Sequence, residues 1–111
     1  MSKRLTLLER MLAEGSSEPF HHYAYAMELR SLGRLEEGLA AFSAVEARFA
    51  SYVPTYLMAA QLAQELSRLD AARDWIQRGL AIARAAGDTH TVGELESLAS
   101  QLVGSTADPR V

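Results

Sequence analysis

The stretch LGRLE at residues 32–36 recurs as LSRLD at residues 66–70, 34 positions further along the chain. The same offset pairs residues on both sides of these stretches: Ala26 with Ala60, Gly38 with Ala72, Phe42 with Ile76, and His22 with Tyr56. Self-similarity at a fixed period of about 20–50 residues is typical of proteins built from stacked structural repeats. The period therefore predicts at least two copies of one structural unit.

Apolar residues at spacings of three and four predict that this unit is helical. Glycine or proline stands at most of the expected helix ends, in the positions that suit each residue. The six expected helices cover residues 3–14, 19–32, 35–49, 54–66, 69–86 and 89–103. Thr91 and Glu94 have the spacing of a capping box at the start of the last helix. Residues 104–111 are expected to form a frayed tail.

Small residues at fixed points on two helices, repeated every 34 residues, make the chain resemble the tetratricopeptide repeat family. The resemblance is strong over residues 19–85 and implies an all-α fold of antiparallel helix pairs stacked into a right-handed superhelix. Within that family, the chain resembles the small bacterial proteins of the stand-alone type. The chain departs from the family at Ser67, where glycine is usual, and at His22 and Tyr56, where tryptophan is common.

The repeat also accounts for the first helix. Shifted by 34 residues, its apolar positions coincide with those of the third helix: Leu5 with Leu39, Leu8 with Phe42, and Met11 with Val45. We therefore expect one domain over residues 1–111, with a half repeat at 3–14, repeats at 19–52 and 53–86, a capping helix at 89–103 and the tail at 104–111.

Composition and charge exclude several classes of protein. The net charge of −3 and pI near 5.6 argue against nucleic acid as a partner, because nucleic-acid binding needs a clustered basic face. The absence of cysteine excludes disulfides and thiolate metal sites. No apolar run approaches the roughly 18 residues of a membrane span. Arginine outnumbers lysine ten to one, which fits a GC-rich bacterial genome, and a cytoplasmic location is expected.

No residue pattern points to catalysis, a cofactor or a metal. His21 and His22 are adjacent, so on a helix they point about 100° apart and cannot chelate as an i, i+4 pair would. We expect His22 to pack between helices and His21 to face solvent. Gly-rich phosphate loops, HExxH and Gly-x-Ser-x-Gly motifs are absent from the sequence. The chain is therefore not expected to be an enzyme.

The family resemblance implies a binding surface on the inner face of the first helix of each repeat. The residues at the corresponding positions are Phe20, Tyr23, Met27, Arg30, Ser31, Leu57, Gln61 and Gln64. Phe20, Tyr23 and Met27 form a second apolar stripe on their helix, beside the stripe expected in the core. The alternative is that the N-terminal helix covers this second stripe through Leu8, Met11 and Leu12.

One binding chemistry of the family is a clamp of Lys, Arg and Asn that grips a peptide C-terminus. The matching positions here hold Tyr23, Ala24, Met27, Pro54 and Met58. None of these carries a charge for a terminal carboxylate. We therefore expect a hydrophobic peptide or helix of a partner protein, because methionine adapts its shape and tyrosine anchors.

The sequence thus predicts a non-catalytic protein–protein interaction module with a concave, largely apolar groove. One alternative is a structural subunit, such as a homodimer, that associates through its convex face or the ends of the stack. In that alternative Trp75 is an exposed anchor; otherwise we expect it to be partly buried against a neighbouring helix. A weaker alternative is a small-ligand protein or an enzyme that uses the aromatic cleft.

Overall fold

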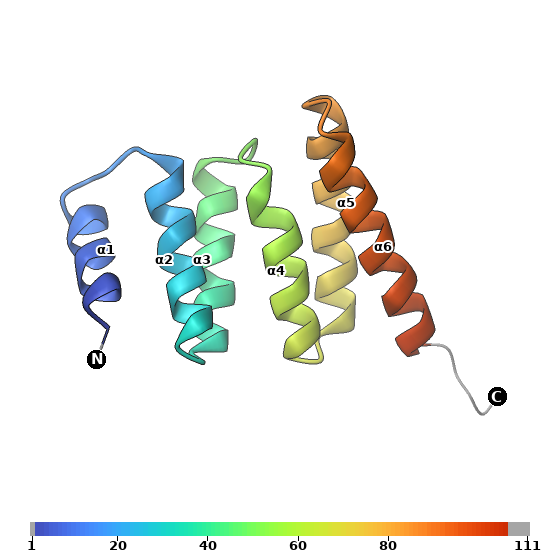
Figure 1. The fold of residues 1–111 in the computed structure, drawn as a ribbon, viewed down its shortest axis with the longest axis horizontal. Helices are drawn as coiled ribbons and strands as arrows, with labels where there is room; N and C mark the ends of the chain where they lie inside the picture. Colours follow the sequence, from blue (N-terminus) through green and yellow to red (C-terminus); the bar gives the residue numbers. More distant parts are fainter. Residues whose placement is uncertain (1, 107–111) are drawn as a thin grey trace.

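The computed structural model describes residues 2–106, and it describes side chains for residues 2–102. Within residues 2–106 it contains six α-helices and no strand, and they follow one another along the molecule in chain order (Figure 1). They are α1 (Lys3–Ala13), α2 (Pro19–Ser31), α3 (Leu35–Arg48), α4 (Pro54–Glu65), α5 (Leu69–Ala85) and α6 (Thr89–Thr106). The expected all-α helical repeat is confirmed.

The helices are arranged in two layers. The molecule measures 51 × 33 × 19 Å, and its smallest dimension matches two layers of helices spaced about 10 Å apart. Each of α2 and α4 packs most extensively on the helix that follows it, and α5 packs on α6. Because α2 also contacts α4, and α4 contacts α6, these three helices are neighbours in one layer. The other layer holds α3 and α5.

The turn after each repeat's first helix has the same backbone structure in both repeats. Gly33 has φ 80° and Ser67 has φ 61°, so both residues are in the left-handed region that ends a helix. The next amide bonds back to a helix carbonyl at 2.9 Å in each case, from Arg34 to Leu29 and from Arg68 to Ala63. A residue with a side chain is strained there by about 1 kcal/mol, and Ser67 carries that strain.

Several helix ends differ from the sequence expectation. Each of α1 to α5 is one residue shorter at its C-terminus, because the expected last residue is the cap. The larger correction concerns α6, which continues through Gly104 to Thr106. Gly104 is helical, and a glycine ends a helix only when it leaves the helical conformation. Residues 107–111 of the expected tail lie outside the described residues.

The expected capping box at the start of α6 is also wrong. Asp88, directly before the helix, accepts hydrogen bonds from the Thr91 backbone N–H at 3.0 Å and from the Thr91 hydroxyl at 2.7 Å. Thr91 is therefore the third residue of the helix and not its cap. These hydrogen bonds to its charged form hold the pKa of the Asp88 carboxyl below its usual range.

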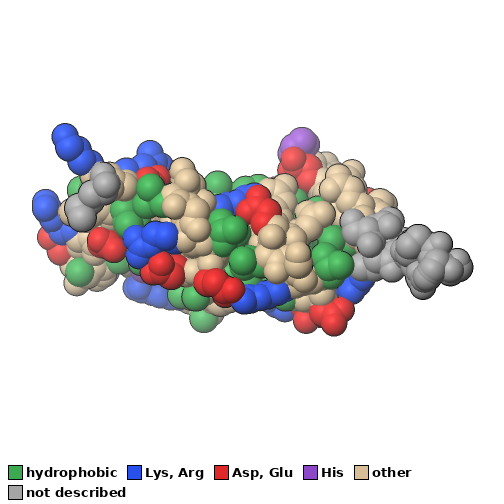
Figure 2. Space-filling view, turned by 90° about the horizontal axis from the view of Figure 1, so that it is seen from below, with side chains coloured by type: hydrophobic (Ala, Val, Ile, Leu, Met, Phe, Trp, Pro, Cys, Tyr) green, Lys and Arg blue, Asp and Glu red, His purple; other side chains and the backbone are tan. Residues whose placement is uncertain are grey.

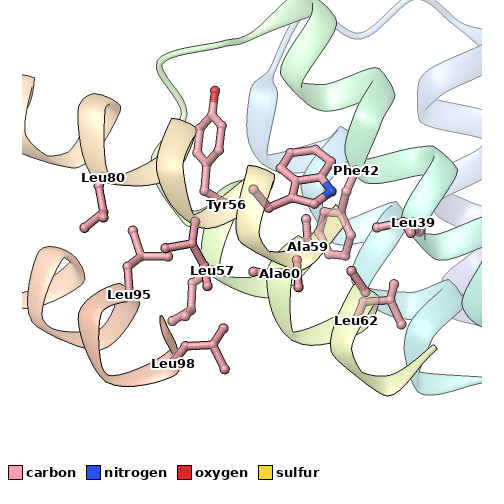
Figure 3. Close-up of a cluster of buried hydrophobic side chains, with 14 of the residues drawn as sticks. Leu39, Phe42, Tyr56, Leu57, Ala59, Ala60, Leu62, Leu80, Leu95 and Leu98 are labelled. Carbon is pink, nitrogen blue, oxygen red and sulfur yellow. The ribbon is translucent and has the colours of Figure 1, made fainter. Parts of the chain in front are cut away.

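The core is centred on Tyr56, which is almost completely buried on α4 (Figure 3). Its ring lies edge-on to that of Trp75, with centroids 5.9 Å apart, and its hydroxyl donates to the Ala50 carbonyl. Trp75 is only 4% exposed, so it is a core residue and not an exposed anchor. This burial is more complete than the partial burial that the sequence suggests.

Glycine allows close helix packing at two positions in this core. A Cβ on Gly79 of α5 would lie 2.6 Å from the Cβ of Tyr56 and 3.1 Å from the Cδ1 of Leu95. A Cβ on Gly38 of α3 would lie 3.2 Å from the Cδ2 of Leu62, the movable end of a side chain. Gly79 is therefore required by the packing of α4, α5 and α6, whereas Gly38 leaves some room.

Ion pairs join the two repeats in both layers. Arg78 of α5 binds Glu46 of α3 through two hydrogen bonds of 2.6 and 3.1 Å, and Arg68 pairs with Glu36. In the other layer Arg30 is 2.8 Å from Glu65. Each exposed pair contributes little stability alone, up to about 1 kcal/mol. Together they add to the packing of α3 on α4, which joins one repeat to the next.

The helical glycines give a graded test of the packing. Gly93→Ala meets nothing within 4 Å and should stabilise the protein by roughly 1 kcal/mol, the difference in helix propensity. Gly38→Ala should be close to neutral, because displacement of Leu62 offsets that gain. Gly79→Ala should destabilise by about 3 kcal/mol through overpacking. Urea unfolding measures all three, and equal stability of the Gly79 and Gly93 variants would contradict the packing around Tyr56.

The Asp88 cap predicts a pH dependence. Because folding lowers the pKa of Asp88, its contribution is fully present above the pKa of the unfolded carboxyl and is lost as pH falls through the lower folded value. Asp88→Ala should lower the Tm at neutral pH, and its difference from the wild type should shrink under strongly acidic conditions. Asp88→Asn is the control, because it keeps a cap oxygen but cannot titrate. Thermal melts from neutral to strongly acidic pH measure this difference. The cap would be contradicted if the Tm difference between the wild type and Asp88→Ala did not change with pH.

Candidate functional site

The expected groove residues of α2 lie toward α4, on a different side of the helix from the Glu28 carboxylate that Ser2 and Arg4 contact. Phe20, Tyr23, Met27 and Arg30 follow one another at spacings of three and four, so they share one side of the helix. The polar contacts between the α1 end of the molecule and α2 lie on a different side of α2, where the Ser2 hydroxyl donates to Glu28 at 2.8 Å and Arg4 lies 3.5 Å from the same carboxylate. Tyr23 and Met27 pack against the main core cluster, and Phe20 remains 50% exposed.

Aromatic rings form the α2 end of this surface. The Tyr23 ring centroid is 6.4 Å from that of Phe20, 5.6 Å from that of Tyr52 and 6.0 Å from that of buried Phe42. Burial raises the pKa of the Tyr23 phenol, Tyr52 raises it further, and Arg30 acts in the opposite direction. Tyr23 is therefore a neutral phenol at physiological pH, anchored on its inner side and accessible on its outer side.

Polar contacts form the middle of the surface, where α2 meets α4. The Arg30 guanidinium donates a hydrogen bond to the Glu65 carboxylate at 2.8 Å. It also lies 3.5 Å from the side-chain oxygen Oε1 of Gln61 and 3.7 Å from the Met58 sulfur. Arg30 thus connects the two helices and is not a free cation. Of the remaining expected residues, Ser31 is exposed and Gln64 is half-buried.

A cleft of about 210 Å³ lies where α4 meets α6. It is lined by Leu57, Gln61, Glu94, Ser97, Leu98 and Gln101. Leu57 was expected in the groove but is mostly buried, so it forms part of the cleft's floor. The structure therefore places Gln61 between an aromatic region on α2 and this cleft beside α6, and the surface is more polar toward α6 than the sequence suggests.

Sequence reasoning missed Tyr52 and the α6 residues of this surface. Tyr52 precedes α4 in a turn, where helical periodicity carries no information about which side chain joins which surface. Glu94, Ser97 and Gln101 were missed because the last helix was interpreted only as a cap. These three residues are spaced by three and four, so they share one face of α6. Comparison with the faces expected to bind on α2 and α4 could have identified them.

The two adjacent histidines hold the turn between α1 and α2. His21 Nδ1 lies 2.7 Å from the Ser16 hydroxyl, and His22 Nε2 donates to the Ser16 carbonyl over 2.7 Å. The His22 ring also packs on Phe49, with centroids 5.1 Å apart. Neither is fully exposed, so the expectation of a solvent-facing His21 is only partly right. Among the described residues, no group of three or more His, Asp or Glu could hold a metal.

The lower edge of the stack, where the α2–α3 and α4–α5 turns lie, shows no large field of one charge among its described residues. Figure 2 shows basic and acidic side chains next to one another, with hydrophobic ones between them. Arg34 and Glu37, 2.7 Å apart, are one such pair. No helix among residues 2–106 is long and apolar enough to span a membrane.

The fold is shared with known structures. The chain is similar to the solution structure of a tetratricopeptide repeat domain protein from Salinibacter ruber, with a TM-score of 0.75 and 30% identity over 79% of this chain and 89% of that one. This chain belongs to the tetratricopeptide repeat family. A crystal structure of a Salinibacter ruber tetratricopeptide repeat domain protein gives a TM-score of 0.74 and 30% identity, covering 79% of this chain and 98% of that one.

A protein from Bordetella parapertussis has the same fold, with a TM-score of 0.83 over 96% of this chain and 93% of that one. Its identity of 22% supports a shared fold alone. No family model and no curated protein matches the sequence. The tetratricopeptide repeat fold commonly mediates protein–protein interaction and is generally non-catalytic.

Phe20 and Tyr23 differ in burial, so their replacement should affect stability differently. Phe20→Ala should change stability by less than about 0.5 kcal/mol, because half of the side chain is already in solvent. Tyr23→Ala should destabilise by about 2 kcal/mol, because it removes a ring that packs on Phe42 and Tyr52. Urea unfolding checks both. If Tyr23→Ala were as harmless as Phe20→Ala, the aromatic cluster would not be packed as described.

Proposed function

We propose that this tetratricopeptide repeat domain binds a peptide or helix of a partner protein along α2, α4 and α6, without catalysing a reaction. In this proposal residues 19–52 and 53–86 are the two repeats, residues 3–14 are a half repeat and α6 is both cap and binding helix. Of the binding residues expected from the sequence, Leu57 is buried, and the others remain at least partly accessible: Phe20, Tyr23, Met27, Arg30, Ser31, Gln61 and Gln64.

The observation that carries the proposal is the partial exposure of an aromatic cluster. Phe20 is 50% exposed and lies beside Tyr23 and Tyr52, neither of which is fully buried. Single exposed apolar residues are common, but contiguous aromatic area on a monomer is characteristic of interaction sites. Aromatic side chains also contribute disproportionately to the free energy of protein–protein binding.

The rest of the surface supports the same use. Amide side chains such as Gln61 and Gln101 offer both donors and acceptors to a peptide backbone. Residues of α2 and α4 already pack in one core cluster, and the Arg30–Glu65 pair links the two helices at the surface, so the surface does not have to form during binding. Pre-organisation of this kind reduces the entropic cost of association. An apolar anchor beside fixed polar groups suits a segment with one large apolar side chain and an accessible backbone.

Self-association is less well supported. Trp75, the candidate anchor on the convex side, is buried. At the α1 end of the stack, Leu7 is 48% exposed beside a hollow of about 410 Å³, but its other lining residues are polar or charged: Ser2, Lys3, Thr6 and Arg10. Among the described residues, Leu32, which is 43% exposed and lines the adjoining hollow, is the other exposed large apolar side chain there, and two such side chains are too few for the hydrophobic centre of a stable interface. Leu7 therefore serves best as a control position.

Selection of binders from a phage-displayed random peptide library tests the proposal. A selected peptide, labelled with fluorescein, should bind with an affinity that Phe20→Ala weakens about tenfold or more, as for an interface anchor. Amide resonances of the ¹⁵N-labelled domain that shift on titration should map to α2, α4 and α6. Fluorescence anisotropy measures the affinities.

Leu7→Ala is the matched control, because Leu7 is equally exposed but lies on α1. It should leave the affinity unchanged. The proposal is contradicted if the library yields no binder, if the shifts map to α1 or to α3 and α5, or if Leu7→Ala weakens binding while Phe20→Ala does not.

A further inference from the structure

The cleft between α4 and α6 has an apolar floor. Leu57 of α4 and Leu98 of α6 line it and are 8% and 5% exposed, so each contributes only a small accessible area. Figure 3 shows Leu57 near Leu95 and Leu98 on the facing helix. The volume of about 210 Å³ is suited to one side chain and is too small for a helix. The floor can accept an aliphatic stem.

The rim of the same cleft is rich in hydrogen-bond acceptors and carries a negative charge. Glu94, Ser97 and Gln101 of α6 line it together with Gln61 of α4. A carboxylate, a hydroxyl and two amides all offer oxygen acceptors. Glu94 is the one acidic side chain of this lining, which holds no basic side chain, so the rim has a negative formal charge.

The charge of Glu94 is not neutralised by an arginine or lysine within the described residues. Its ion-pair partner is His90, at 3.4 Å, whose side chain is 84% exposed. Arg30, which approaches the cleft through Gln61, is already paired with Glu65. By contrast, Glu96 of the same helix pairs with Arg84 at 3.3 Å. Glu94 is therefore a carboxylate available to an incoming cation.

We infer that this cleft binds the side chain of a lysine or arginine in the partner segment. Both side chains combine an aliphatic stem of about three or four methylene groups with a cationic head. The stem matches the Leu57–Leu98 floor, and the head matches the Glu94 carboxylate and the neighbouring oxygens of Ser97 and Gln101. The inference rests on the proposed function and adds the chemistry of one residue of the partner.

Model compounds test this site separately from peptide binding. N-acetyl-arginine amide and N-acetyl-lysine amide, titrated into the ¹⁵N-labelled domain, should shift the amide resonances of residues 57, 61, 94, 97, 98 and 101. N-acetyl-norleucine amide, which has the lysine stem without the charge, should bind about fivefold more weakly. Raising the salt concentration should reduce this difference, because the contact is partly exposed.

Two variants on α6 form a matched pair. Glu94→Gln should reduce the affinity for the arginine compound to that for norleucine, whereas Glu96→Gln, on a paired carboxylate outside the cleft, should leave the fivefold preference intact. Both replacements are at exposed positions and preserve side-chain size, so far-UV circular dichroism should be unchanged.

The outcomes separate the two proposals. If library peptides bind through Phe20 but norleucine binds the cleft as well as arginine, or Glu94→Gln has no effect, the basic-residue site is refuted and peptide binding stands. If the arginine compound binds the cleft as described and no peptide binds the domain, the site stands and the proposed function fails.

Discussion

The contact between the Tyr56 ring and the bare backbone of Gly79 is the constraint on which the rest of the structure depends. A side chain at Gly79 would occupy space that is filled by Tyr56 of α4 and by the Leu95 side chain of α6, so α4, α5 and α6 meet only because none is present. Tyr56 also contacts Trp75 and donates to the Ala50 carbonyl, which ties the turn before α4 to the core. The position of α6 beside α4, and with it the cleft, follows from this contact.

The two layers have different tasks. The layer of α3 and α5 carries the Arg78–Glu46 and Arg68–Glu36 pairs, which join the repeats at positions remote from the candidate surface. Among the side chains that the structure describes, the layer of α2, α4 and α6 has one such pair, Arg30–Glu65, and it leaves aromatic and amide side chains accessible between its helices. Most of the ion pairs between the repeats therefore lie in the layer of α3 and α5. The surface proposed for binding instead presents aromatic and amide side chains that can contact another chain.

The fold could be predicted from the sequence, but the candidate site only in outline. The 34-residue offset identifies the helices and the small residues between them, because repeated units must bury the same faces. Periodicity cannot show how deep a residue lies: Phe20 and Tyr23 belong to one stripe, yet only Phe20 is half exposed. Gly79 and the Asp88 cap were not anticipated, because each depends on a neighbour that the sequence does not identify. Ser67 shows the reverse case, in which the fold imposes a backbone conformation that its residue type disfavours.

Because Trp75 is buried where α4 packs on α5, its fluorescence reports on that contact. As the one tryptophan of the chain, it senses Tyr56 and Arg78, whose guanidinium carbon lies 4.6 Å from the ring centroid. Leu5 and Leu8, the buried residues of α1, lie outside the core cluster that contains Trp75. Tryptophan emission therefore reports whether α4 remains packed on α5, whereas far-UV circular dichroism reports the helical content of the whole stack. Separation of the α1 helix would change the second signal and leave the first unaltered.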